Sequence, residues 1–386
     1  MISYREYKQF LIDIFGEDKI TLTEGEFIEN NIVGAIRHYN QSGENFGFFR
    51  ERFKKRLIRL KSTFEGNEGV LNDIIIKSQN IAKKKWFGEY SELVVYDFFS
   101  SYFDLETELT IEKERTYASI LPGRVESSFD GKISKNEFNQ VFEVKSLTDV
   151  SRAMIDNIIK AAKSRNTGVW EITAGYNQDI EYSKIEENFA TILNGLNQTI
   201  RGNGSMYSPE GYNLTFLIYY QPKRVLTSES TYSTLDHAQA LKYYVLNHFD
   251  QLFINEKNLL IYVVHPWFNL INTNDFLGKQ EFIEHFSQSC FEDLTNSEEK
   301  IKDVFPKWNN VKLEIKEVAQ RISGILFLFD NNVVPHSTYS ATDEFSEIEA
   351  FLFTNDNAIT QCKFSEADLE ILKEFKTQRN LKINGC

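Results

Sequence analysis

The sequence is poor in cysteine and has no long apolar run. Cys290, Cys362 and Cys386 share no CxxC or other metal-ligand spacing, which excludes a disulfide-stapled scaffold and favours a reducing, cytoplasmic setting. No apolar stretch approaches the length needed to cross a bilayer. The N-terminal segment MISYREYKQFLIDIF carries charges where a signal peptide would be apolar, so we expect neither secretion nor a membrane anchor.

Several catalytic patterns are also missing. The six histidines are scattered, without zinc-ligand spacing, and no G-x-S-x-G occurs, so zinc and serine-hydrolase chemistry have no support. The chain is long and rich in apolar residues: it has 386 residues, 41% of them hydrophobic, with 32 phenylalanines. This supply of apolar area predicts a large core in one large domain or two to three smaller ones.

Positive charge is scarce overall, because the formal net charge is −13. Between residues 50 and 85, however, eleven basic residues stand against four acidic ones. Such a stripe is typical of a phosphate-binding surface, although a solvated helix face explains it equally well. The candidate nucleic-acid contacts here are Lys54, Lys55, Arg56, Lys83, Lys84 and Lys85.

The hydrophobic pattern predicts an α/β (α+β) protein with a mixed sheet flanked by helices. Residues 1–69 are expected to form a mostly helical region, followed by a helix over 70–103 that Gly88 interrupts. Residues 196–212 are expected to form an exposed loop. Strands are predicted at 117–121, 127–133, 140–147, 214–220, 259–265, 322–329 and 349–354, and further helices at 149–163, 235–253, 280–291 and 311–320.

The most informative stretch is SSFDGKISKNEFNQVFEVKSL, residues 127–147. Two β-type runs flank a polar centre, which indicates an antiparallel hairpin. If its turn centres between residues 136 and 137, Asp130 lies opposite Glu143, and Lys145 projects from the same face as Glu143. One hairpin would then gather two carboxylates and one ammonium.

This grouping suits phosphodiester hydrolysis. Mg²⁺ prefers oxygen ligands and usually takes one or two carboxylates, together with water and substrate phosphate. Asp130 and Glu143 could supply the carboxylates, while Lys145 orients the attacking water or offsets charge on the phosphate.

The pattern Asp130, twelve residues, then Glu143-Val144-Lys145 resembles the PD-(D/E)xK nuclease superfamily, which has the restriction-endonuclease-like fold. Glu92, in the upstream run GEYSELVVYDFF, matches an acidic residue that many members carry on the preceding helix. The resemblance covers about residues 70–165. The position before Asp130 is phenylalanine rather than proline, a departure at a position that varies widely.

The resemblance implies a Mg²⁺-dependent endonuclease that hydrolyses DNA, with Mn²⁺ as a substitute, and by analogy a prokaryotic restriction or antiviral defence enzyme. Asp130 and Glu143 would bind metal, aided by the Val144 carbonyl and by Glu92, and Lys145 would be the catalytic lysine. The nuclease domain would span 70–386, with its catalytic core at 86–165 and a C-terminal elaboration that either extends the sheet or forms a specificity domain. Arg152 and Lys160, on the helix after the hairpin, are further candidate DNA contacts.

Three alternatives stay open at this point. The charged residues of the hairpin could be the wet face of a half-exposed ribbon. The chain could be an inactive protein of the same fold that binds nucleic acid or a protein partner. It could also be an RNA-specific or structure-specific nuclease. Many family members dimerise to cut both strands, and the acidic composition neither requires nor forbids a homodimer.

Overall fold

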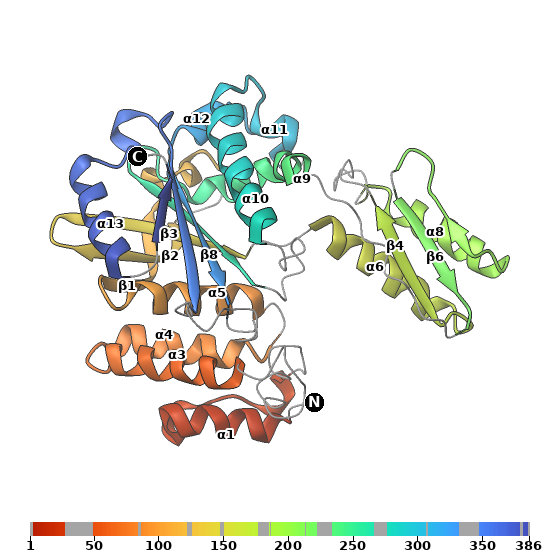
Figure 1. The fold of residues 1–386 in the computed structure, drawn as a ribbon, viewed down its shortest axis with the longest axis horizontal. Coiled ribbons are helices and arrows are strands. Elements are labelled where there is room, and N and C mark those ends of the chain that lie inside the picture. The colour runs from red at the N-terminus through yellow and green to blue at the C-terminus, as the bar shows by residue number, and fades with distance from the viewer. Residues whose placement is uncertain are drawn as a thin grey trace. The chain divides into compact units, whose positions relative to one another are not determined.

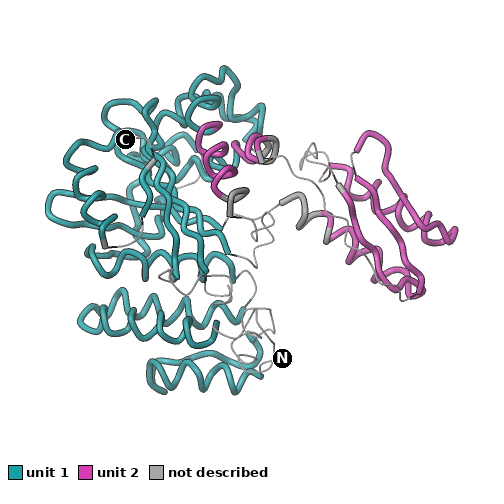
Figure 2. Tube along the Cα trace, viewed as in Figure 1, with its two compact units in different colours: residues 1–147, 243–268, 290–386 teal, residues 148–242, 269–289 magenta. Residues whose placement is uncertain are grey.

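The chain divides into two compact units. The computed structural model describes residues 3–27, 49–83, 86–121, 126–146, 150–176, 185, 187–212, 214–221, 234–265, 276–305, 308–331, 347–378 and 381–384. Unit 1 comprises residues 1–147, 243–268 and 290–386, and unit 2 comprises residues 148–242 and 269–289 (Figure 2). Both units are therefore discontinuous in sequence, and residue 69, the boundary predicted from sequence, lies inside unit 1.

Four α-helices of the described residues form the N-terminal part of unit 1. Ser3 and Glu6 cap the first of them reciprocally, and its apolar residues fall on one buried face. The side chain of Asn67 accepts the Val70 N–H and starts the third. Figure 1 shows α5 next to the sheet, with α3 and α4 beyond it and α1 outermost. The four are α1 Tyr4–Phe15, α3 Phe49–Phe64, α4 Glu68–Asn80 and α5 Trp86–Phe99.

A seven-stranded mixed sheet is the centre of unit 1 (Figure 1). Its order is β1-β2-β3-β7-β8-β9-β10; β3, β7 and β8 are parallel neighbours, β10 is parallel to β9, and the other pairs are antiparallel. β7 and β8 are buried along their whole length, as continuous apolar strands covered on both faces should be. The strands are β1 Asp104–Glu112, β2 Glu126–Lys135, β3 Phe138–Ser146, β7 Asn258–Val264, β8 Ile322–Asp330, β9 Ile348–Thr354 and β10 Leu381–Asn384.

One hydrophobic core joins the N-terminal helices to the sheet. Tyr7 of α1, Phe53 of α3, Leu93 of α5 and Ile261 of β7 all belong to it. Phe375 of the C-terminal helix α13 Glu366–Gln378 packs on Phe98 and Phe99 of α5, with ring centroids 5.1 and 5.9 Å apart. The described residues of the 1–69 segment are thus mostly helical, as predicted, but they share a core with the sheet. The structure also describes the short α-helices α11 Ile301–Val304 and α12 Ile315–Ala319 in unit 1.

Unit 2 has a small sheet and a core of its own. The strand order is β4-β6-β5, with both pairs antiparallel. Apolar residues of α6 and α8, including Ile158 and Leu196, pack with Phe216 of β6. Its elements are α6 Val150–Arg165, β4 Glu171–Tyr176, α8 Phe189–Arg201, β5 Met206–Tyr207, β6 Leu214–Tyr219, α9 Thr234–Leu241 and α10 Phe276–Gln288.

The structure corrects three predictions of secondary structure. Residues 117–120 form a 3-10 turn rather than a strand, because the Thr116 hydroxyl accepts the Ala118 N–H. The predicted 196–212 loop begins inside helix α8, whose apolar residues recur at helical spacing. The predicted 70–103 helix is two helices, and the break follows Asn80 while Gly88 lies within α5.

The prediction of a mixed α/β protein is confirmed. In the part of the chain that the structure describes, no helix combines the length and apolar character needed to span a membrane.

Candidate functional site

The predicted hairpin is present with the predicted register. Asn136 adopts a left-handed conformation, with φ of 55°, at the turn between β2 and β3. The paired residues run from Lys135 opposite Phe138 to Gly131 opposite Phe142. This pairing requires the turn to centre between residues 136 and 137, as the sequence predicted.

Beyond Gly131 the backbone ladder ends, and a carboxylate takes the place of a backbone acceptor. Oδ2 of Asp130 accepts the backbone N–H of Val144 at 2.6 Å. The hydroxyl of Tyr96, on α5, donates to the Asp130 carbonyl at 2.9 Å. Side chain and main chain of Asp130 are therefore both fixed, the first against β3 and the second against α5.

Glu143 and Lys145 lie on the same strand, two residues apart, and their side chains meet. Nζ of Lys145 donates to Oε1 of Glu143 at 2.6 Å. Glu143 is only 4% exposed, so it is not on the wet face that a half-exposed ribbon would present. Its other oxygen, Oε2, is buried and has no hydrogen-bond partner among the described residues. A buried carboxylate oxygen in this state is costly unless a cation or a proton compensates it.

Glu92 joins this site from helix α5 through a lysine that sequence reasoning did not single out. Lys77, on α4, forms an ion pair with Glu92 and a 2.5 Å pair with Glu108 of β1. It also lies 3.5 Å from Asp73 and 3.6 Å from Glu89. The sequence showed Lys77 as one member of the basic stripe; its role depends on the packing of α4 against β1 and α5.

Burial dominates the electrostatics of the site. It raises the pKa of Glu143 to about 7; the charge of Asp130 adds to the rise, and Lys145 and the Asp130 backbone N–H oppose it. Burial, followed by the charge of Asp130, also raises the pKa of Glu92 to about 8, against the effect of Lys77. The pKa of Asp130 itself is raised by burial, although Lys145, the Val144 N–H and Lys77 all lower it. Positive charge is therefore in deficit around these three carboxyls.

The site fits a hard divalent cation in part. In the described ranges, no three or more histidine, cysteine, aspartate and glutamate side chains are arranged as a complete metal site. The orphaned Oε2 of Glu143 and the fixed carboxylate of Asp130 nevertheless offer oxygen donors of the kind that such a cation takes. Water and substrate phosphate commonly supply the other ligands of Mg²⁺. The Val144 N–H donates to Asp130, and the role of the Val144 carbonyl as a ligand stays a prediction.

The predicted nucleic-acid contacts fall into different environments. Lys54 and Lys55 are exposed on α3. Lys83 is partly exposed and pairs with Glu26 at 3.1 Å. Lys84 and Lys85 lie outside the described residues. Among the described members of the stripe, Lys54 and Lys55 are therefore the ones best presented to solvent.

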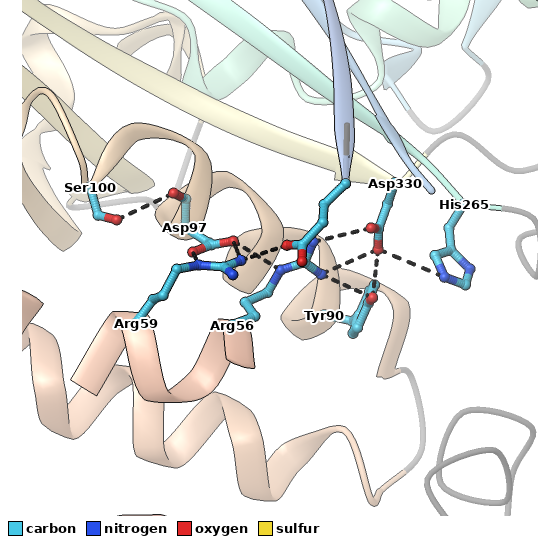
Figure 3. Close-up of polar contacts among 8 residues, drawn as sticks. Arg56, Arg59, Tyr90, Asp97, Ser100, His265 and Asp330 are labelled. Carbon is cyan, nitrogen blue, oxygen red and sulfur yellow. Dashed lines mark hydrogen bonds and ion pairs between the residues drawn. The ribbon is translucent and has the colours of Figure 1, made fainter. Parts of the chain in front are cut away.

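Arg56 does not fit the predicted role, because its side chain is completely buried. Its guanidinium bonds to Asp97 of α5, to Asp330 at the end of β8 and to the Tyr90 hydroxyl (Figure 3). His265, directly after β7, lies 3.8 Å from the same Asp330 carboxylate. A periodic signal was available in the sequence: Arg56 lies in phase with the buried residues Phe49, Phe53, Leu57 and Leu60 of α3.

The remaining candidates belong to unit 2. Lys160 is exposed on α6. Arg152 lies in the first part of the same helix, and its side chain is outside the described residues.

Comparison with known proteins gives no match. No protein-family model, no curated protein and no solved structure matches this chain.

Proposed function

We propose that this chain is a metal-dependent endonuclease that hydrolyses phosphodiester bonds of DNA, with the active site at Asp130, Glu143 and Lys145. The observation that carries the proposal is the convergence of these three side chains on two adjacent strands. Oδ2 of Asp130 is bound to the β3 backbone, and Lys145 is bound to Glu143 on that same strand. The arrangement agrees with the resemblance of the motif to PD-(D/E)xK nucleases and with a restriction-endonuclease-like fold.

Each residue has a distinct task in this proposal. Asp130 and Glu143 would hold a Mg²⁺ ion, which Mn²⁺ could replace. When bound, the ion supplies Lewis acidity toward the scissile phosphate and a lower pKa for coordinated water. The Nζ of Lys145, held by Glu143, would neutralise charge on the phosphate and orient the attacking water. Glu92 supports the same charge balance from α5.

The exposed lysines of α3 give the proposal a surface for the DNA backbone. Lys54 and Lys55 are adjacent and exposed on a helix of the unit that carries the active site. Because phosphate contacts supply affinity without reading sequence, these lysines would position the duplex and leave sequence choice to other groups. By analogy with standalone nucleases of this kind, we propose a role in prokaryotic restriction or antiviral defence.

The test compares variants of one hairpin. Purified wild type, Asp130→Asn, Glu143→Gln and Lys145→Ala are incubated with supercoiled plasmid and Mg²⁺, and nicking is followed on gels. Each change removes or neutralises a group of the site, so we expect at least a 100-fold loss of cleavage with retained circular dichroism spectra. Lys132→Ala is the matched control, since this lysine lies on β2 and pairs with exposed Glu106 outside the site.

Equal cleavage by all variants, or loss in the control alone, would reject the proposed site. A parallel panel of duplex DNA, single-stranded DNA and RNA distinguishes the DNA nuclease from an RNA-specific one. No cleavage of any substrate by the wild type, combined with retained binding, would instead favour an inactive binding protein.

A further inference from the structure

Lys77 is a buried cation surrounded by acidic side chains. Its side chain is 4% exposed, and it lies near four carboxylates supplied by its own helix α4, by α5 and by β1. The ammonium also lies 5.9 Å from the ring centroid of Tyr96, whose hydroxyl binds the carbonyl of Asp130. Lys77 therefore adjoins the candidate active site on its α5 side.

Charge balance around Lys77 is unusual for an ordinary salt bridge. One positive charge compensates Asp73, Glu89, Glu92 and Glu108 together, and its field also reaches Asp130. Asp73 and Glu92 are mostly buried, with side chains 13% exposed, whereas Glu108 is 54% exposed. The two desolvated carboxylates make the position of the Lys77 ammonium attractive to positive charge. A divalent ion would be drawn to this place if the ammonium were absent.

We propose that Lys77 is a built-in cation that takes the position of a second metal ion, so that Lys77 positions Glu92 and limits the site to one divalent ion at Asp130 and Glu143. The inference rests on the proposed function and adds to it the metal count and a positioning residue. Because Lys77 pairs with Oε2 of Glu92, a metal ion at that oxygen would compete with the ammonium. The ion pair fixes this carboxylate from the neighbouring helix α4.

A purely structural role for Lys77 makes a different prediction. A structural ion pair would lower stability when removed, and the number of bound metal ions would stay the same. A cation that stands in for a metal would, when removed, leave a vacant acidic site that recruits one. Metal stoichiometry therefore separates the two roles.

The experiment counts Mn²⁺ ions bound to the full-length protein without nucleic acid. Loss of the free-ion electron paramagnetic resonance signal is measured for wild type, Lys77→Met, Lys77→Arg and Glu143→Gln at neutral pH. We expect one ion in the wild type, two in Lys77→Met and one in Lys77→Arg, which keeps the charge. Two ions in the wild type would overturn the inference directly, even if Lys77→Met failed to fold.

The outcomes also separate this inference from the proposed nuclease site. One ion in the wild type and one in Lys77→Met would overturn the role of Lys77 and leave the Asp130 and Glu143 site intact. No ion in the wild type but one in Lys77→Met would support the role of Lys77 and count against the proposed metal site. No ion in either protein would overturn both. Loss of one ion in Glu143→Gln assigns the wild-type ion to the proposed site.

Discussion

The Arg56 guanidinium and the Asp330 carboxylate form an ion pair of 3.1 Å in which neither side chain is exposed (Figure 3). The pair joins helix α3 to Asp330, the last residue of strand β8. Asp97 shares the same guanidinium from α5. Arg56, a member of the basic segment 50–85, is therefore buried in the interior. Removing its guanidinium would leave the negative charge of Asp330 buried.

We expect Arg56→Met to lower the free energy of unfolding by about 3–5 kcal/mol, because it removes one partner of a buried ion pair. Urea unfolding followed by circular dichroism measures the loss. Arg59→Met is the control, since Arg59 binds the same Asp97 but its side chain is 39% exposed. Equal losses in the two variants would contradict the interpretation.

Gly131 supports the site through its lack of a side chain. A Cβ at this position would lie 2.5 Å from Cζ of Phe142 and 2.8 Å from the backbone carbonyl oxygen of Glu106. We therefore expect Gly131→Ala to cost about 1–3 kcal/mol of stability, as overpacking does. The midpoint of urea unfolding measures this cost, and the control is Gly66→Ala, where a Cβ would meet no atom within 4 Å. An unchanged midpoint in Gly131→Ala would show that β2 and β3 can separate without penalty.

Protonation of Glu143 should stabilise the metal-free protein as the pH falls. Its pKa in the folded state, about 7, lies above the ordinary value of 4.5, so the folded state binds the proton more tightly than the unfolded state does. Stability linked to this proton is present at low pH and is lost as pH rises through about 7. Thermal unfolding in EDTA should show a gain of about 1 kcal/mol between pH 8 and 6.5. Glu143→Gln should reduce that gain, and an identical slope in both proteins would refute the assignment.

His265 acts in the opposite direction and at lower pH. Burial, opposed by Asp330 and assisted by Arg56, lowers its pKa to about 4 from 6.5, so the unfolded state takes up the proton first as pH falls. Stability linked to His265 is complete above about pH 6.5 and is lost as pH falls toward 4. The expected loss between pH 6.5 and 4.5 is about 2 kcal/mol. His265→Phe should flatten this part of the profile, whereas the partly exposed His285→Gln should retain it.

Exposed lysines on α3 should contribute to DNA affinity through counterion release. Lys54→Glu with Lys55→Glu should weaken binding to a fluorescent duplex and make its logarithmic dependence on salt shallower. The control is Lys363→Glu with Lys376→Glu, two exposed lysines whose change alters the net charge by the same amount. If both double variants lose affinity equally, the effect is one of overall charge, and α3 is not the DNA-binding helix.

Sequence patterns predicted the hairpin and its three charged residues because the information there is local. Alternating apolar residues and a polar turn fix the pairing of β2 with β3, and pairing fixes which side chains meet. The same reasoning could not reveal that the ladder stops at Gly131 and that Oδ2 of Asp130 replaces a backbone acceptor. That detail depends on where β3 stops pairing with β2 and pairs only with β7.

The environments of Arg56 and Lys77 could not be predicted from the local sequence pattern. The sequence pattern grouped Arg56 with its exposed neighbours Lys54 and Lys55. In the structure Arg56 lies on the same face of α3 as the buried apolar residues and forms an ion pair with Asp330. Lys77 was counted in the same basic stripe, yet it is buried among carboxylates from other elements. In both cases the partner lies far away in sequence, so the charge of the residue alone does not reveal its environment.

The order of strands has a consequence for how the protein is made. β3, which carries Glu143 and Lys145, has β7 as its neighbour, and residues 148–242 of unit 2 stand between them in the chain. During synthesis, the edge of β3 that pairs with β7 therefore stays without its neighbouring strand until the segment beyond residue 258 has left the ribosome. A fragment that ends at residue 165 would retain all three site residues and keep that edge permanently open, so we expect it to aggregate rather than act as a minimal nuclease.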